Sequence, residues 1–494
     1  MLDLRASLLL LTCVAGSCRA QQATQAGAAI APFAPAQVRL LRSFGAVGDG
    51  RSDDTAAMLR ALQRSDVYCL DGERRAYRVT GTLRVSRSIC LRNATLVQSA
   101  VPVITSPYIT HGCAPVQSPS AVSNCGDPAI PADLFPAVWR SLSIRTLLIR
   151  PGGNDPLRVN LEGVKVDRGR YAEGGSRSDS AGIWLDGADG VRLRNVEITG
   201  DGKGYGLLVT NARNVRIDNL WVHDLVWAPY RGERALTEPG AASTGWNAVP
   251  IHELREPGRD GVRAGKFYGV RIQEQLTCVF LANVAHVVIN NARIERCLAR
   301  FPTGDLPWQT DGLDIGRSSS DIRVNNSRVS ATWEGMEVAG GGDGIEGLVI
   351  SGLSISNSFS FGLKMGYDLR NATVRRLAID HAGLSGIVLY GPVRNVRISS
   401  ALIRDVGAVR RNGGSYSPWP AGNRSGIRLD EGSGTGSTGV RVPDNVIVED
   451  IAVVGQPNQY EYGILNTGGK HIDLMHFNAQ GFGIACARGI ADLR

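Results

Sequence analysis

Short segments with one pattern of apolar and variable positions recur along the chain. Each has the frame x-Gly-apolar-x-apolar, in which the first and fourth positions are free to vary. The frame occurs at residues 181–185, 205–209, 311–315, 334–338, 361–365, 385–389, 425–429 and, ending in Asn, 462–466. Glycine marks a tight bend, and the alternation behind it indicates a strand with one buried face. The pattern therefore predicts a series of short, half-buried strands.

These segments repeat with a nearly constant period. The glycines are 24 residues apart from Gly182 to Gly206, 23 from Gly312 to Gly335 and 27 from Gly335 to Gly362. Periods of about 20–50 residues indicate a solenoid or another repeat array. A β-sandwich also spaces its strands by about 8–12 residues, but it gives no reason for glycine to recur in register.

A second pattern, alternating β-forming residues with Asn, Ser or Asp in the middle, lies between the glycine segments. Its members are residues 191–198, 215–222, 287–294, 322–329, 348–355 and 446–453. Each repeat thus holds two or three short strands, and the period of two argues against a helix. We predict an all-β chain that folds as a right-handed parallel β-helix, a solenoid in which the middle asparagines form turns and ladder from coil to coil.

The N-terminal residues have the features of a secretion signal. Arg5 supplies the positive charge, residues 6–16 the apolar stretch and residues 18–20 a cleavage site. We predict a signal peptide at 1–20, a linker at 21–37 and a single β-helix domain at 38–494. A lipid anchor at Cys18 is the weaker alternative. No segment is apolar for long enough to span a bilayer, so the protein is expected to be secreted or periplasmic.

Four stretches break the coil rhythm. They are residues 99–140, 226–262, 298–310 and 407–423. Insertions in a solenoid usually rim one face, and that face usually binds the ligand. Their aromatic residues could stack on sugar rings or simply pack the loops onto the solenoid.

The charge is moderately positive and widely spread. Loss of Asp3, Arg5 and Arg19 with the signal peptide leaves 52 Lys and Arg against 45 Asp and Glu. This excess indicates either a mild preference for anionic polymers such as uronate polysaccharides or a basic surface that binds no particular ligand. No clustered basic patch supports a nucleic-acid partner. The sequence leaves a monomer and a homotrimer open.

Seven cysteines remain after removal of the signal peptide, and an exported chain can keep disulfides. Three local pairs are predicted: Cys69 with Cys90, Cys113 with Cys125 and Cys278 with Cys297. Cys486 is left over. No Cys/His spacing resembles a zinc site, so no metal is expected through thiolates.

The variable positions of the frame become charged in two consecutive repeats. Asp311 and Asp314 occupy them in the first, and Glu334 and Glu337 in the second, with Lys364 in the next. Neighbouring coils lie about 4.8 Å apart, so these carboxylates should repel and raise at least one pKa. When one carboxyl has a raised pKa and its neighbour does not, the first can act as an acid and the second as a base. Cleavage of a glycosidic bond needs two such carboxyls. We therefore predict these four carboxylates as catalytic residues. An acidic stripe neutralised by Lys364, or a calcium site, is the alternative.

Other charged and aromatic residues on or beside the same columns are predicted to contact substrate. They are Trp184, Trp308, Trp333, Lys364, Tyr390 and Arg428. Lys364 would tune a carboxyl pKa or hold the substrate.

Residues 44–55 read Phe-Gly-Ala-Val-Gly-Asp-Gly-Arg-Ser-Asp-Asp-Thr. This segment resembles the start of the pectate-lyase-like β-helix superfamily, in which it precedes a capping helix. We expect such a helix here, capped by Ser52 or Asp53 and running to about Arg64. The resemblance implies the fold and a carbohydrate-active protein, and lyases, hydrolases and phage tailspikes share it.

Residues 309–315, Gln-Thr-Asp-Gly-Leu-Asp-Ile, resemble the Asn-Thr-Asp-Gly-Xaa-Asp motif of glycoside hydrolase family 28, the polygalacturonase group. The resemblance extends over about 310–390 and implies that Asp314 and Glu334 are carboxylates of the site. Trp333 stands in the place of the general acid, Phe361 in that of the histidine, and Val388 and Tyr390 in those of Arg and Lys. It implies a sugar polymer but not ordinary polygalacturonase activity, with Glu337 or Asp311 in the missing role.

Three functions remain open. The first is a secreted glycoside hydrolase that needs no cofactor. The second is a polysaccharide lyase in which Lys364 is the base and the carboxylates hold calcium, although Val388 stands one coil on, where an Arg is expected, and Arg428 two coils on. A C5-epimerase is a lesser variant, since its Asp-Pro-His-Asp motif is absent. The third is a non-catalytic glycan-binding solenoid.

Overall fold

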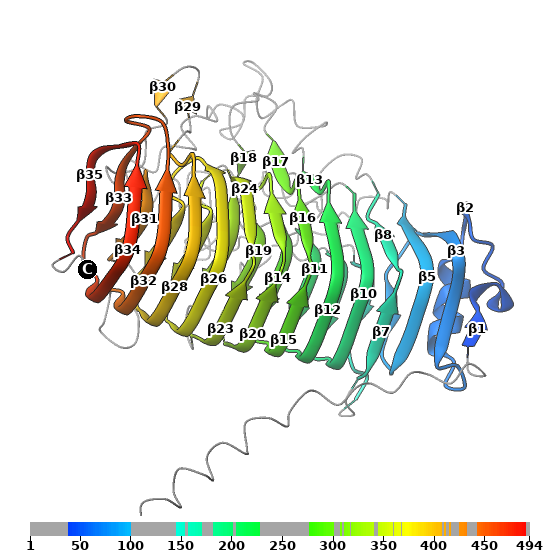
Figure 1. Ribbon diagram of the computed structural model, residues 1–494. Helices are drawn as coiled ribbons and strands as arrows, with labels where there is room; N and C mark the ends of the chain where they lie inside the picture. Colours follow the sequence, from blue (N-terminus) through cyan, green and yellow to red (C-terminus); the bar gives the residue numbers. More distant parts are fainter. Residues whose placement is uncertain are drawn as a thin grey trace, which may run out of the picture.

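The computed structural model describes residues 38–99, 145–153, 157–169, 181–200, 204–227, 276–300, 307–308, 311–316, 318–339, 344–358, 360–366, 368–407, 410–411, 414–415, 424–431 and 442–490. These residues form a right-handed parallel β-helix. Its coils stack along one axis from β1 and β3 at the N-terminal end to β33, β34 and β35 at the other (Figure 1).

The glycine segments form one 12-stranded parallel sheet, here called the glycine sheet, whose strands lie in chain order. Its strands are β4 (Leu83–Val85), β6 (Arg145–Ile149), β9 (Ala181–Asp186), β11 (Gly204–Thr210), β14 (Leu276–Ala282), β19 (Asp311–Gly316), β22 (Glu334–Ala339), β25 (Leu363–Gly366), β27 (Ile387–Tyr390), β31 (Ser425–Asp430), β33 (Tyr460–Asn466) and β35 (Phe482–Arg488). The predicted strands are therefore confirmed as a single stack.

The second pattern forms an 18-stranded sheet, here called the asparagine sheet. Its strands are β1 (Val38–Leu40), β2 (Asp49–Asp53), β3 (Cys69–Val79), β5 (Ile89–Gln98), β7 (Val159–Glu162), β8 (Lys165–Asp167), β10 (Asp189–Thr199), β12 (Arg213–His223), β15 (Ala285–Asn290), β16 (Arg293–Glu295), β20 (Ser319–Asn325), β21 (Arg328–Ser330), β23 (Ile345–Ser351), β24 (Ser354–Ser358), β26 (Leu369–Ala382), β28 (Val393–Arg404), β32 (Asp444–Val454) and β34 (Lys470–Gln480). Asn195 and Asn219 have φ of 54° and 58°, and the Asn219 amide donates to Asn195 Oδ1 at 2.9 Å. The predicted asparagine ladder is confirmed at these turns, because Asn tolerates left-handed backbone and its amide reaches the next coil.

Two small sheets fall within predicted insertions. The strands β13 (Val226–Trp227), β17 (Leu298–Arg300) and β18 (Pro307–Trp308) form one, and β29 (Arg410–Arg411) and β30 (Gly414–Ser415) form the other. The remainder of the four predicted insertions lies for the most part outside the described residues. The signal peptide at 1–20 and the linker at 21–37 also lie outside them, and stay predictions.

The N-terminal coil is covered by a short 3-10 helix, η2 (Leu41–Phe44), and the helix α1 (Thr55–Gln63), as Figure 1 shows at the blue end. Met58 and Leu62 of α1 are buried in the core, which confirms the predicted capping helix. Of the two predicted capping residues, Asp53 accepts the backbone N–H of Thr55, the first residue of α1, at 3.0 Å. Asp54 precedes α1, and its carboxylate accepts the backbone N–H groups of Val47 and Gly48 at 2.6 and 3.1 Å, so it holds the glycine turn rather than the helix.

Two predicted disulfides, Cys69–Cys90 and Cys278–Cys297, are present. The predicted Cys113–Cys125 pair lies outside the described residues. Cys486 is a free, half-buried thiol. Neither described helix is long and apolar enough to cross a membrane.

The recurring glycine is required by close packing between coils rather than by a left-handed bend. A Cβ at Gly312 would lie 2.6 Å from the carbonyl oxygen of Gly335, and one at Gly335 would lie 2.6 Å from that of Gly362. None of these three glycines has positive φ. Each glycine lets the carbonyl of the next coil approach, and this keeps the glycine sheet in register.

We therefore expect Gly335→Ala to lower the free energy of unfolding by about 3 kcal/mol, because the added methyl meets Ile355 and the Gly362 carbonyl. Urea unfolding followed by circular dichroism measures the change. Gly153→Ala is the matched control, since a Cβ there meets no atom within 4 Å. Equal stability of the two variants would contradict the packing explanation.

Candidate active site

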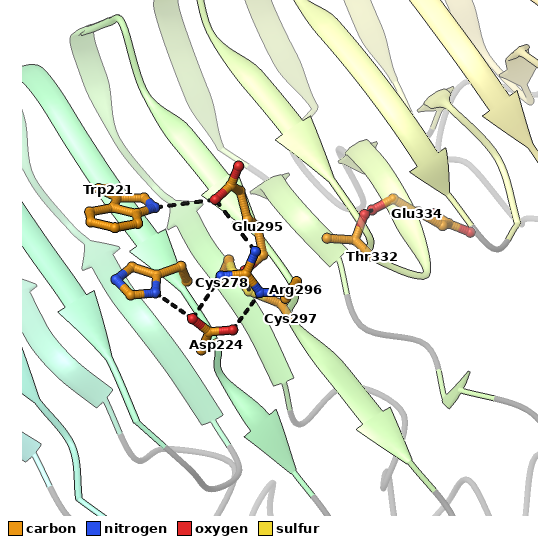
Figure 2. The surroundings of a disulfide bond; sticks show 9 residues. Trp221, Asp224, Cys278, Glu295, Arg296, Cys297, Thr332 and Glu334 are labelled. Carbon is orange, nitrogen blue, oxygen red and sulfur yellow. Dashed lines mark hydrogen bonds and ion pairs between the residues drawn. A yellow bond between two sulfur atoms is a disulfide. The ribbon is translucent and has the colours of Figure 1, made fainter. Parts of the chain in front are cut away.

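The four predicted carboxylates come together on the glycine sheet. Asp311 pairs in register with Glu334, and Asp314 with Glu337. Lys364 of β25 follows Glu337 on the next coil. The start of β22 is fixed by Thr332, whose Oγ1 donates to the Glu334 carbonyl oxygen at 2.8 Å. Figure 2 shows Thr332 and Glu334 together, apart from the Cys278–Cys297 disulfide.

These carboxylates, here called the acidic cluster, are largely removed from solvent. Asp311, Glu334 and Glu337 are 6%, 3% and 8% exposed, and Asp314 is half-buried. The Lys364 ammonium lies 2.8 Å from Glu337 Oε1 and 3.3 Å from Glu334 Oε1. Lys364 therefore lies inside the cluster as a counterion to two carboxylates, so of its two predicted roles the geometry favours tuning a pKa.

Burial and mutual repulsion raise the pKa values of the buried carboxyls. Burial raises the pKa of Asp311 well above its ordinary value, and the charges of Glu337, Glu334 and Asp314 add to this effect. Burial raises the pKa of Glu334 to about 7, because the opposing influence of Lys364 is smaller. Glu334 thus holds a proton through much of the mildly acidic range.

Lys364 shifts in the direction that its neighbours impose. Burial acts to lower the pKa of Lys364, but the charges of Glu334 and Glu337 outweigh it and hold that pKa well above the ordinary value. The lysine is therefore cationic at neutral pH.

Two carboxylate oxygens have no hydrogen-bond donor among the described residues. They are Asp311 Oδ1 and Glu334 Oε2. One oxygen each from Asp311, Asp314 and Glu337 also lie within 4.8 Å of one another. Three oxygens so placed fit one calcium ion, because ligands at 2.3–2.6 Å from the ion lie at most about 5 Å apart. The cluster can thus accept hydrogen bonds from a ligand or hold a divalent cation.

The predicted substrate-binding residues are spread along the same sheet. Trp333 is half-buried next to Glu334. Trp184 lies on the column that runs through Leu208 and Phe280 to Asp314, and its Nε1 donates to Thr210 Oγ1 at 2.8 Å. The backbone of Trp308 pairs with β17, and its side chain lies outside the described residues.

On the other side of the cluster, the column continues from Lys364 to Val388 and Arg428. The Arg428 guanidinium lies 2.6 Å from Asp430 Oδ2. Tyr390 ends β27, in register with Gly366. The substrate-binding role of all six residues stays a prediction. The register places four of them, Trp184, Lys364, Tyr390 and Arg428, on strands of the glycine sheet.

Sequence reasoning did not select Phe280, although it lies beside Asp314. Its ring stacks on Tyr205, with centroids 5.4 Å apart and planes at 17°. The frame of apolar and variable positions could have found it, because Phe280 occupies the same column as Trp184. Its place in the column follows from the repeat, but the apolar residues Leu208 and Val388 occupy the same column, so a ring there gives no signal of binding by itself.

A second polar group, near the Cys278–Cys297 disulfide, was also missed (Figure 2). The carboxylate of Asp224 accepts from Arg296 and contacts His223 Nδ1 at 2.7 Å. Glu295 accepts from Arg293 at 2.7 Å and from Trp221 at 3.4 Å. Because its charges are paired with one another, this group is better suited to hold neighbouring coils together than to bind a ligand.

Fold and site together define a right-handed β-helix with a buried acidic cluster on one sheet. No family model matches the chain, and no curated protein matches it. Among solved structures, the chain is similar to the A-module of mannuronan C-5 epimerase AlgE6 from Azotobacter vinelandii, with 15% identity and a TM-score of 0.52 over 92% of this chain and 100% of that one.

The AlgE4 A-module of the same organism gives 14% identity and a TM-score of 0.53 over 91% and 100% of the two chains. The Dettilon tailspike protein gives 13% identity and a TM-score of 0.58 over 91% of this chain and 68% of that one. These likenesses confirm the expected fold, a right-handed parallel β-helix. The likeness of residues 310–390 to glycoside hydrolase family 28 rests on the sequence motifs alone.

Proposed function

We propose that the protein is a polysaccharide-degrading enzyme, a glycoside hydrolase whose reaction centre is the acidic cluster. The observation that carries this proposal is the two stacked carboxylate pairs on adjacent coils, Asp311 with Glu334 and Asp314 with Glu337, in which Glu334 has a pKa of about 7. A general acid for glycosidic cleavage needs such a raised pKa, and a second carboxylate must stay ionised.

In this mechanism, the Glu334 carboxyl donates its proton to the glycosidic oxygen as the bond to the anomeric carbon breaks. Asp314, the more exposed of the four carboxylates, either attacks the anomeric carbon or takes a proton from the attacking water. Besides burial, the charge of Glu337 raises the pKa of both Glu334 and Asp311, and Lys364 limits that rise. The anomeric form of the first product would distinguish the two roles of Asp314.

The comparisons support a polymer as substrate. Two of the similar structures are modules of mannuronan C-5 epimerases, and mannuronan is a polysaccharide. An unbroken sheet of stacked coils suits an extended chain, because equivalent positions repeat about every 4.8 Å along the axis.

A product assay tests the proposal. The purified mature chain and Asp314→Asn are incubated with acidic and neutral polysaccharides, and reducing ends and unsaturated-uronate absorbance are followed together. We expect reducing ends without absorbance, reduced in the variant by about 10²-fold or more. Absorbance that grows with time would support a lyase instead, and no product from any polymer would favour a glycan-binding protein.

A lyase is the second candidate, because the Asp311, Asp314 and Glu337 oxygens are close enough to hold calcium. Carboxylate oxygens are the ligands that calcium prefers, and the bound ion would neutralise a uronate carboxylate. The raised pKa of Lys364 counts against this candidate, since a lysine that stays protonated is a poor base for the proton at C5.

We also propose that the mature protein is secreted or periplasmic. The predicted signal peptide supports this location, and so do the two disulfides, which persist in oxidising compartments.

A further inference from the structure

We propose that the sugar unit held at the acidic cluster is uncharged, and that Phe280 and Tyr390 hold the polysaccharide on either side of it. The inference rests on the proposed function and adds the substrate class. It differs from one of the two interpretations of the net charge of the chain, a mild preference for anionic polymers.

The first argument is electrostatic. The acidic cluster contains four carboxylates, and its one described cation, Lys364, is shared by Glu334 and Glu337. The next cation on this column, Arg428, lies two coils further on and is bound to Asp430. Above about pH 7, where Glu334 has lost its proton, a uronate carboxylate placed here would face like charges in a largely buried setting, where repulsion is only weakly screened. An uncharged sugar avoids that cost.

The second argument concerns hydrogen bonds. Asp311 Oδ1 and Glu334 Oε2 are buried acceptors that receive no donor from the described residues. A buried acceptor without a donor is costly. Sugar hydroxyls would supply O–H donors to both oxygens, whereas an ionised carboxylate only accepts. Uronate units carry hydroxyls as well, so this argument excludes only the uronate carboxylate from contact with these two oxygens and places hydroxyl groups there.

The third argument is the space beside the cluster. Two positions after Asp314, Glu337 and Lys364, the strands end in Gly316, Ala339 and Gly366, which are in register with one another. Among the described residues of these three coils, the position beside the charged column therefore carries nothing larger than a methyl group of its own. Ala339 is half-buried, so its methyl group faces an accessible surface that a sugar ring could cover.

Aromatic rings border this surface at both ends. A Cβ built on Gly316 would lie 3.1 Å from the Phe280 ring, and one built on Gly366 would lie 3.3 Å from Cδ1 of Tyr390. Each ring thus lies against a strand of the cluster, Phe280 against the end of β19 and Tyr390 against the end of β25, with Ala339 on the strand between them. The Phe280 ring is further held by its stacking on Tyr205. Such rings offer a flat apolar face, which suits the C–H groups of an uncharged sugar ring.

Binding to matched polymers tests the substrate class. Affinity electrophoresis of the wild-type chain is run at pH 8, where the proposed acid, Glu334, has lost its proton and turnover is slow. The ligands are polygalacturonate, mannuronan, the carboxyl-reduced form of each, and a panel of neutral glucans, mannans and galactans. Each reduced polymer keeps its backbone and loses only its charge.

We expect at least one neutral polymer to bind about tenfold or more tightly than either uronate polymer, and the difference to shrink at pH 5 as the cluster takes up protons. Tighter binding of a uronate polymer than of its reduced form, with or without calcium, would overturn the inference. So would the failure of every neutral polymer to bind. Binding of a neutral polymer without release of reducing ends in the product assay would instead refute the hydrolase and leave the inference standing.

A variant tests the position of the binding surface. Ala339→Leu is expected to weaken binding of the neutral polymer about tenfold, because the larger side chain fills the surface beside Glu337. Ala452→Leu is the matched control, since Ala452 is a half-buried alanine on the asparagine sheet. Circular dichroism confirms that both variants fold. Wild-type affinity of a folded Ala339→Leu would overturn the placement of the sugar.

Discussion

Replacement of Glu334 by glutamine is expected to lower the rate of polysaccharide hydrolysis at pH 6 by about 10²- to 10⁴-fold, the usual contribution of a general acid. Glutamine keeps the shape of the side chain and cannot donate the proton. The rate of the wild-type enzyme should fall as pH rises through about 7, because Glu334 then loses its proton. The residual rate of Glu334→Gln should lack this fall. Release of reducing ends between pH 4 and 9 measures both effects.

The same substitution should change the pH dependence of stability. The pKa of Glu334 is raised from 4.5 to about 7 in the folded chain, so the folded state keeps a proton that the unfolded chain has lost. The free energy of unfolding of the wild type therefore falls as pH rises from about 4.5 to 7, by up to about 3 kcal/mol from this group. Glu334→Gln removes that contribution. The free energy of unfolding of the variant, taken relative to that of the wild type at the same pH, should therefore be higher at pH 8 than at pH 4.

Glu346→Gln is the control for both measurements, because Glu346 is an exposed carboxylate on β23 of the asparagine sheet. It should leave the rate and the pH profile unchanged. Activity of Glu334→Gln within about threefold of wild type would exclude Glu334 as the acid and direct attention to Asp311, whose pKa is also raised.

The sequence predicts the carboxylate pairs because register in this fold follows from glycine position. Gly312 and Gly335 stack, so the residues that flank them stack as well, and Asp311 necessarily meets Glu334. The position of Lys364 in the column follows in the same way. What the repeat does not encode is the rotamer that turns the Lys364 ammonium toward both Glu334 and Glu337.

Other features depend on contacts between segments that the repeat does not relate. The place of Phe280 in the column follows from the repeat, but its stacking on Tyr205 does not. Helix capping is a local signal, so the sequence pointed to Asp53, which accepts the Thr55 N–H. The bonds of Asp54 to the Val47 and Gly48 N–H groups belong to the preceding turn and were not anticipated. The surface formed by Gly316, Ala339 and Gly366 becomes visible only when three coils are aligned.

Removal of the Lys364 charge is expected to have the largest effect on stability. Lys364→Met should lower the free energy of unfolding by about 3–5 kcal/mol at pH 8, because it leaves buried carboxylates without their counterion.

Since the folded pKa of Lys364 is raised, its stabilising contribution is present throughout the range below its ordinary pKa and is lost only in strong alkali. Any pH dependence of the loss between pH 5 and 8 therefore comes from the carboxylates. At pH 5, Glu334 and Asp311 can take up protons, so the loss should be smaller.

Lys165→Met provides the matched comparison. Lys165 forms an ion pair with Glu197 at 2.7 Å, but its side chain is 40% exposed. Exposed pairs contribute little, so this variant should unfold within about 1 kcal/mol of wild type at both pH values. Urea unfolding of the three chains at pH 5 and pH 8 measures the differences. If Lys364→Met matched Lys165→Met at pH 8, the carboxylates would already be protonated in the wild type, and neither the acid–base division of the cluster nor its repulsion of uronate would hold.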